Sequence, residues 1–123
     1  VDHLRQHFST LLGEIGAGEV FDGFAAYRDA LHAQGIALNV ISLVGHAALR
    51  LAVLGYDDRP ATPEERSRMQ QLLDRQLADG AFGLSLGLVY PPSAYADSEE
   101  LQALARTTGA RGKILHLARD CRQ

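Results

Sequence analysis

Two kinds of side chain in this sequence could do chemistry near the end of a strand, an imidazole and a hydroxyl. His46 follows Gly45 directly after a run of apolar residues. An imidazole in that position can bind a ligand or exchange a proton near neutral pH, and it can equally hold a turn by hydrogen bonding to a carbonyl group. His46 is therefore a candidate for lining a substrate site, with the structural role as the alternative.

A serine nucleophile is the second kind of chemistry. Residues 83–87 read Gly-Leu-Ser-Leu-Gly and satisfy the G-x-S-x-G pattern around Ser85. That pattern serves catalysis where a strand turns sharply into a helix and exposes the serine. Here small and apolar residues continue as a strand, so we do not expect Ser85 to be a nucleophile.

A histidine pair near the start of the chain could bind a metal ion. His3 and His7 are one helical turn apart, a spacing at which two imidazoles can chelate. No Glu lies between them to act as a base. A solvated helix face is the simpler interpretation.

Two capping signals mark helices that would position such groups. Residues 62–65 read Thr-Pro-Glu-Glu, which combines a threonine cap, proline at the first helical position and glutamate three residues after the cap. They predict a helix that runs to a stop at Gly80. Residues 97–100 read Asp-Ser-Glu-Glu and predict a second helix, which we expect to end at Gly109.

Three apolar runs predict strands. Residues 36–44 are nearly all apolar and partly β-branched, which is typical of a strand covered on both faces. Residues 81–89 continue without a charge until Pro91 and Pro92 remove backbone donors, and residues 113–117 form the third run. We therefore expect three strands in this chain, the first of them buried.

Two further helices are predicted ahead of these strands. Residues 4–12 carry apolar side chains at helical spacing, and a helix from about residue 24 is framed by Asp22 as a possible cap and Gly35 as a stop. Single helices between strands imply right-handed crossovers and a parallel sheet. The sequence thus predicts one α/β domain over residues 1–123, although eight strands with their helices would take roughly 250 residues.

Composition narrows the classes of function. The 123 residues are 46% apolar, enough for one compact domain, and the net charge of −3 comes from mixed signs along the chain. We expect no nucleic acid partner, because the basic residues are not gathered on one face. No apolar stretch is long enough to cross a membrane, and a lone Cys121 excludes an intrachain disulfide, which together favour a cytoplasmic protein.

The sequence resembles N-acyl-D-amino-acid deacylases (D-aminoacylases) of the amidohydrolase superfamily. Residues 39–50, NVISLVGHAALR, are similar to a strand and following turn of that family. Residues 61–106 add an Ala-Thr-Pro helix start, a Gly-Ala-x-Gly-Leu-Ser strand and a Tyr-Pro-Pro loop. The similarity covers about residues 21–106, so the chain looks like an internal part of such an enzyme.

The resemblance implies a fold and a reaction. Members of this family are zinc-dependent hydrolases that remove the acyl group from N-acylated D-amino acids, and their metal ligands come from several strand ends of a (β/α)₈ barrel. The family's opening His-x-His pair does not occur in this sequence. Its metal-binding Cys lies upstream of the matching part, and its later His and Asp lie downstream. The resemblance therefore implies a partial barrel that lacks most of its metal site.

Two positions match residues with a role in the family. His116 stands where the family places a metal-binding His, although the Thr that usually precedes it is missing and Arg119 comes one position late. A strand-end His that bonds a neighbouring backbone group is the alternative. Tyr90 lies in a GLVYPP segment similar to the loop whose Tyr binds the substrate carboxylate, and a packed loop anchor is the alternative.

Two interpretations of the whole chain remain. In the first, it is a fragment of a deacylase or a truncated relative, without activity until missing sequence completes the barrel. In the second, it is a small α/β scaffold or binding protein that buries its open sheet edges by self-association, with a dimer as the default and higher oligomers possible. An N-acyl-D-amino acid is expected as a ligand only if the site is completed.

Overall fold

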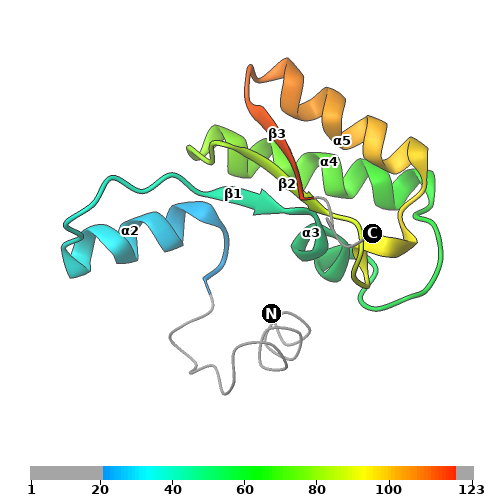
Figure 1. Ribbon diagram of the computed structural model, residues 1–123, viewed down its shortest axis with the longest axis horizontal. Helices are drawn as coiled ribbons and strands as arrows, with labels where there is room; N and C mark the ends of the chain where they lie inside the picture. The colour runs from blue at the N-terminus through cyan, green and yellow to red at the C-terminus, as the bar shows by residue number, and fades with distance from the viewer. Residues whose placement is uncertain (1–20, 119–123) are drawn as a thin grey trace.

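Three parallel strands form the centre of the protein in the computed structural model, which describes residues 21–118 (Figure 1). The strands β1 (Leu43–Gly45), β2 (Gly83–Gly87) and β3 (Ile114–Ala118) lie in the order β1-β2-β3. The helices are α2 (Phe24–Gln34), α3 (His46–Val53), α4 (Pro63–Ala78) and α5 (Ser98–Ala110), with a short 3₁₀ turn, η2 (Ser93–Tyr95). The predicted α/β class with parallel strands is confirmed. The helix predicted over residues 4–12, the His3 and His7 pair and Cys121 lie outside the described residues.

The core lies between the sheet and the helices α4 and α5, which lie along one side of it (Figure 1). Met69, Leu73 and Leu77 form the apolar stripe of α4 and are at most 2% exposed. They pack with Leu84 of β2 and Leu104 of α5 in one cluster. The period of 3.6 residues on α4 and of two on β2 therefore places every one of these side chains in a shared interior.

Helix α4 begins as predicted. The Thr62 hydroxyl accepts a hydrogen bond from the backbone N–H of Glu65 (3.3 Å), and the Glu65 carboxylate accepts one from the N–H of Thr62 (2.9 Å). The Arg59 guanidinium adds two further bonds of 2.8 Å to the same carboxylate. The helix ends at Ala78, and Gly80 takes the left-handed conformation with φ of 113°. The predicted stop is therefore confirmed.

Helix α5 begins as predicted but ends later. The Asp97 carboxylate accepts a hydrogen bond from the backbone N–H of Glu100 (2.8 Å). The expected stop at Gly109 is wrong, because the helix continues to Ala110 and the left-handed turn falls at Gly112, with φ of 63°. A helix can pass through a glycine at a modest cost, so the next glycine can serve as the stop.

Helix α2 has the predicted end but a different start. Gly35 ends it with φ of 72°, whereas its cap is Gly23, without a side-chain cap bond, so the proposed cap at Asp22 is wrong. Arg28 donates a hydrogen bond to the carbonyl of Asp79 (2.9 Å), which attaches α2 to the end of α4. No residue of α2 is buried. The partly buried Phe24 and the bond from Arg28 therefore connect this helix to the rest of the fold.

The predicted buried strand over residues 36–44 is wrong for most of its length. Only Leu43–Gly45 pairs with β2, and Leu38 and Ile41 are 78% and 68% exposed. An apolar run forms a buried strand only where a partner strand and covering side chains are present. Residues 36–41 are exposed, and Ser42 contributes to this pairing through its carbonyl, which accepts a hydrogen bond from the N–H of Phe82 (2.9 Å).

Helix α3 is an element that the sequence did not indicate. Its eight residues follow β1 directly, and its cap residue, Gly45, makes no side-chain cap bond. A helix of this length is marginal by itself, so tertiary contacts must hold it. The helix buries Leu49 and Leu51 together with the charged side chain of Arg50. Among all the described helices, none is long and apolar enough to span a bilayer.

Gly83 allows β2 and β3 to approach each other closely. A Cβ at this position would overlap the carbonyl oxygen of Ile114 and lie 2.7 Å from its Cγ1 atom, whereas a Cβ at Gly87 would meet nothing within 4 Å. We expect Gly83→Ala to lower the free energy of unfolding by about 1–3 kcal/mol, because the two strands must shift. Gly87→Ala on the same strand is the control and should change it by less than about 0.5 kcal/mol. Equal urea midpoints for the two variants would contradict this account.

Glu65 makes stability depend on pH. The hydrogen bond from Arg59, followed by that from the backbone of Thr62, lowers the pKa of Glu65 from 4.5 to about 2. A carboxyl group with a lowered folded-state pKa stabilises the fold above its unfolded pKa, and this contribution disappears as the pH falls towards the folded value. We expect Glu65→Gln to lose stability at neutral pH and to converge with the original protein as the pH falls from about 4.5 to about 2.

Urea unfolding at several pH values measures this effect. Glu64→Gln is the matched control, since it removes an exposed carboxylate from the same first turn of α4. The difference should shrink in high salt, because the Arg59 side chain is 40% exposed and its charge is partly screened. A gap between Glu65→Gln and the original protein that stays constant from pH 7 to about 2 would exclude this role for Glu65.

Candidate functional site

Three residues lie side by side across the sheet, and two predicted site residues belong to this row or adjoin it: His116 is in the row, and His46 follows Gly45. Gly45 of β1 pairs with Ser85 of β2, which pairs with His116 of β3. Side chains alternate between the two faces of a strand, and those of Leu84 and Leu86 point into the helix-covered core. Ser85 and His116 therefore belong to the opposite face of the sheet.

His116 is exposed and lies at the third of the five residues of β3, so it sits within the strand and not at its end. Its imidazole could act as one metal ligand, since histidine nitrogen is a common ligand of zinc. A zinc site needs three or four such groups, and residues 21–118 contain no cluster of three or more His, Cys, Asp or Glu side chains able to hold a metal ion. The described residues therefore do not make up a metal site on their own.

Tyr90 lies on an anchored loop but is itself open to solvent. It lies three residues beyond β2, and the residue is 64% exposed. Its carbonyl accepts a hydrogen bond from the N–H of Ala94 (3.0 Å), while Pro92 and Ser93 are buried beneath it. The phenol is thus not packed in the interior and can donate a hydrogen bond to a ligand.

His46 has the opposite environment. It is the first residue of α3, it is 0% exposed, and its Nε2 atom lies 2.7 Å from Oε1 of Glu100. An ionised carboxylate only accepts hydrogen bonds, so Nε2 donates this one. The bond accounts for the position of His46 without a substrate, and its partner is a side chain instead of the carbonyl considered from the sequence.

Arg50 and Glu100 complete a set of charged groups that sequence reasoning missed. Arg50 donates from one guanidinium nitrogen to Oε2 of Glu100 (2.5 Å) and from the other to the carbonyl of Arg59 (2.7 Å). His46, Arg50 and Glu100 all have side chains that are 0% exposed, and we call them the buried charge cluster. One signal could have found it, since His46 and Arg50 are four residues apart in an otherwise apolar segment, a spacing that would place both on one face if the segment were helical.

The buried charge cluster neutralises a carboxylate that would otherwise be costly to bury. Each oxygen of Glu100 receives a hydrogen bond from a different partner, His46 or Arg50. A buried charge is tolerated when it is paired and its lone pairs are satisfied. Within residues 21–118, three buried side-chain atoms have no hydrogen-bond partner, namely His46 Nδ1, Arg50 Nε and Ser93 Oγ.

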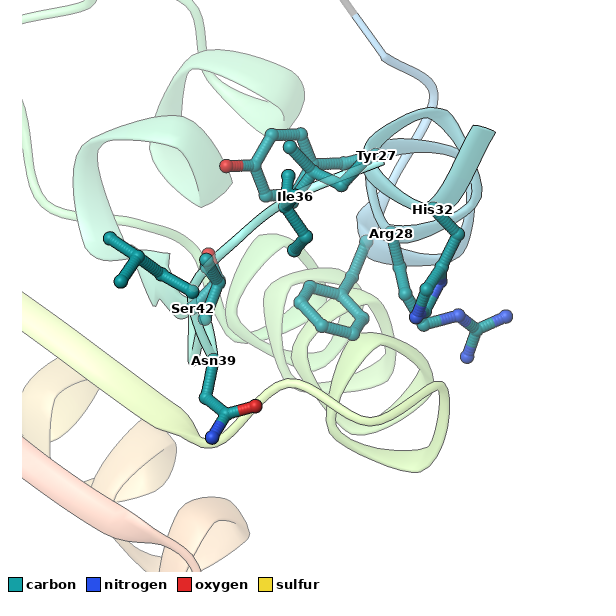
Figure 2. A pocket seen from close by; sticks show the side chains of 10 residues that line it. Tyr27, Arg28, His32, Ile36, Asn39 and Ser42 are labelled. Carbon is teal, nitrogen blue, oxygen red and sulfur yellow. The ribbon is translucent and has the colours of Figure 1, made fainter. Parts of the chain in front are cut away.

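A groove of about 350 Å³ lies elsewhere, between α2 and the segment that leads into β1. Tyr27, Arg28 and His32 line it from α2, and Ile36 and Asn39 from the facing segment (Figure 2). The Arg28 guanidinium already bonds to a carbonyl and to the neighbouring carboxylate of α2. The groove lies before the start of β1, away from the carboxyl ends of the strands, and does not include any predicted site residue.

The buried charge cluster predicts an unequal cost for two arginine substitutions. Arg50→Met leaves the Glu100 carboxylate without its cationic partner, and we expect it to lower the free energy of unfolding by about 3–5 kcal/mol. Arg111→Met is the control, because the side chains of Arg111 and its partner Asp74 are 40% and 46% exposed, and a pair of this kind is worth at most about 1 kcal/mol.

A double variant separates the loss of pairing from the loss of packing. Arg50→Met combined with Glu100→Leu removes both charges, so it should recover more than half of the stability that Arg50→Met loses. Urea unfolding of the four proteins gives the comparison. Equal losses in Arg50→Met and Arg111→Met would show that the cluster contributes nothing beyond a surface pair.

Comparison with known proteins shows similarity to deacylases of N-acylated D-amino acids. No protein-family model matches the chain. The chain is 42% identical to the D-aminoacylase of Alcaligenes xylosoxydans xylosoxydans over 99 residues, and 44% identical to the N-acyl-D-aspartate deacylase of the same organism over 100 residues. These matches cover 80% and 79% of this chain but only 20% of each relative.

Solved structures show the same relation. A D-aminoacylase with a binuclear metal centre superposes with a TM-score of 0.79 at 39% identity, over 87% of this chain and 23% of that protein. The N-acyl-D-glutamate deacylase of Bordetella bronchiseptica, in complex with zinc and a phosphonate inhibitor, gives 0.77 at 41% identity, over 83% and 22%. The resemblance predicted from the sequence is confirmed: the chain is similar to D-aminoacylases and spans about a fifth of their length.

Proposed function

We propose that this chain forms one sector of a (β/α)₈ barrel in a metal-dependent N-acyl-D-amino-acid deacylase and has no activity by itself. The observation that carries the proposal is the placement of two polar side chains that the fold does not use for packing. His116 is exposed on the sheet face opposite the core, and Tyr90 is exposed beyond the carboxyl end of β2. Active sites of such barrels lie at the carboxyl ends of the strands.

His116 is proposed as one ligand of the metal ion. Related enzymes contain metal, including zinc in the N-acyl-D-glutamate deacylase structure. A bound zinc ion would lower the pKa of a water molecule and polarise the amide carbonyl. The other ligands would have to come from sequence beyond this segment, since residues 21–118 contain no cluster that could hold the ion.

Tyr90 is proposed to bind the carboxylate of the substrate. Its phenol can donate one hydrogen bond, and the buried residues after it keep the loop in place. His46, by contrast, is assigned a structural role here, because its side chain is 0% exposed and bonded to Glu100. The prediction that His46 lines the substrate site is therefore not carried into this proposal.

A self-associating scaffold is the alternative. All five residues of β3 are exposed, and its apolar side chains Ile114, Leu115 and Leu117 are 46–49% exposed. An edge strand with apolar side chains tends to pair with another chain. A second copy of this chain, in a dimer or a larger assembly, would cover this edge.

A chimeric enzyme tests the proposed function. We expect a D-aminoacylase whose matching fifth is replaced by this chain to hydrolyse an N-acetyl-D-amino acid, whereas the 123-residue chain alone should show no hydrolysis and well under one zinc per chain. His116→Ala in the chimera should lower both zinc content and activity. Tyr90→Phe should raise KM by up to about tenfold, because one hydrogen bond to the substrate is lost.

Matched controls give these results their meaning. Tyr95→Phe changes the second tyrosine of the same loop, and His32→Ala removes an imidazole of α2 that lies away from the strand ends. Both should leave zinc content and KM unchanged. A chimera that folds and binds zinc equally well with His116→Ala would rule out the ligand role. A dimeric chain without zinc, combined with an inactive folded chimera, would favour the scaffold.

A further inference from the structure

We propose that the buried charge cluster is a positioning device for the loop of residues 88–97, which carries Tyr90. By joining the first turn of α5 to the first turn of α3, the cluster fixes the end of this loop and the surface on which the loop rests. The inference rests on the proposed function only for the meaning of Tyr90 as a substrate contact. The contacts that argue for it come from the described residues alone.

The carboxylate of Glu100 has different partners from that of Glu65, the residue at the same position of α4. Glu65 occupies the third position of α4 and bonds back to the backbone of its own cap, Thr62. Glu100 occupies the same position in α5, and the N–H of its own backbone is likewise bonded to the cap, Asp97. Its carboxylate, however, bonds to His46 and Arg50. The side chain that could complete a local capping box instead makes a tertiary contact.

This tertiary contact joins two chain segments beyond the carboxyl ends of neighbouring strands. His46 is the first residue of α3, directly after β1, and Glu100 is 54 residues further along the chain. Glu100 lies in the first turn of α5, just past the loop that follows β2. The bond of 2.7 Å between their side chains therefore sets the spacing between the two connections at this end of the sheet.

The loop lies between the two joined helix starts. It leaves β2 after Gly87 and ends at Asp97, whose carboxylate holds the N–H of Glu100 at 2.8 Å. Its middle, η2, packs against both α3 and β2, and Ser93 is only 2% exposed. A shift of α3 relative to α5 would move both the support and the end of the loop. The Tyr90 side chain would move with them.

Arg50 links the buried charge cluster to a third part of the chain, the segment between α3 and α4. Besides bonding to Glu100, it donates to the carbonyl of Arg59 (2.7 Å), in the segment between α3 and α4. Because all three side chains of the cluster are 0% exposed, water does not compete for these bonds. Charged partners restrict the geometry more than apolar packing would, since each hydrogen bond requires its own distance and angle.

Hydrogen exchange of the 123-residue chain tests the proposal without any need for catalysis. We expect Glu100→Gln to raise exchange rates of backbone amides in residues 88–97 by on the order of tenfold, while the interior of α4 changes much less. The matched control is Glu65→Gln, which removes a carboxylate from the same position of α4 and should leave residues 88–97 unchanged. A uniform rise across the protein, or no rise in the loop, would overturn the positioning role.

A second measurement applies if Glu100→Gln does not fold. Native-state exchange of the unaltered chain in increasing urea shows which segments open together. The proposal requires residues 88–97 to open with the first turns of α3 and α5, with the same urea dependence. A loop that opens separately, at a lower free energy than those turns, would overturn it. Neither result depends on zinc or on hydrolysis, so failure here is distinct from failure of the proposed function.

Discussion

The Glu100 carboxylate lies in the protein interior with none of its side chain exposed, and the arrangement of three segments depends on how this charge is paired. Removing a carboxylate from water is costly, and the cost is offset only when a counter-charge and hydrogen bonds surround it. Arg50 provides the charge and His46 the second bond. Both come from α3, a short helix that lacks a side-chain cap. The start of α5 and the position of α3 are therefore coupled through one side chain.

The two faces of the sheet have different roles. On one face, Leu84 packs with the apolar stripe of α4 and with Leu104 of α5 in a closed core. On the other, Ser85 and His116 lie in register and His116 is exposed. The exposed His116 on this face and the exposed apolar side chains of the edge strand β3 support the proposal that the chain is one sector of a barrel. Its similarity to about a fifth of each D-aminoacylase agrees with that view.

The candidate groups divide according to what the fold requires of them. The side chain of His46 is buried and bonded to Glu100. The side chains of Tyr90 and His116 are exposed to solvent, and the backbone holds these two residues in place. An exposed residue such as Tyr90 or His116 can contact a ligand without any loss of packing. The groove beside α2 contains several polar groups, but it borders a helix with no buried residue. The positions near the sheet therefore lie beside the core, whereas the groove lies beside a helix with no buried side chain.

The sequence alone determined the elements whose signals are local. The caps Thr62 and Asp97 and the left-handed glycine Gly80 each act within a few residues of a helix end, and the structure has them as expected. The parallel arrangement also followed, because a helix between two strands brings the chain back to the same edge. The motifs around Tyr90 and His116 were likewise readable, although their roles remain predictions.

Tertiary structure decided what depends on distant partners. The apolar run from residue 36 becomes a strand only from Leu43, because a strand needs another strand beside it. Helix α3 exists because the interior accepts its buried face. The pairing of His46 with Glu100 spans 54 residues, and no local pattern distinguishes it from the capping box that the same glutamate could have formed. Local rules fix where a helix starts, but the energetic demand of a buried charge is met only by whatever the fold brings within reach of it.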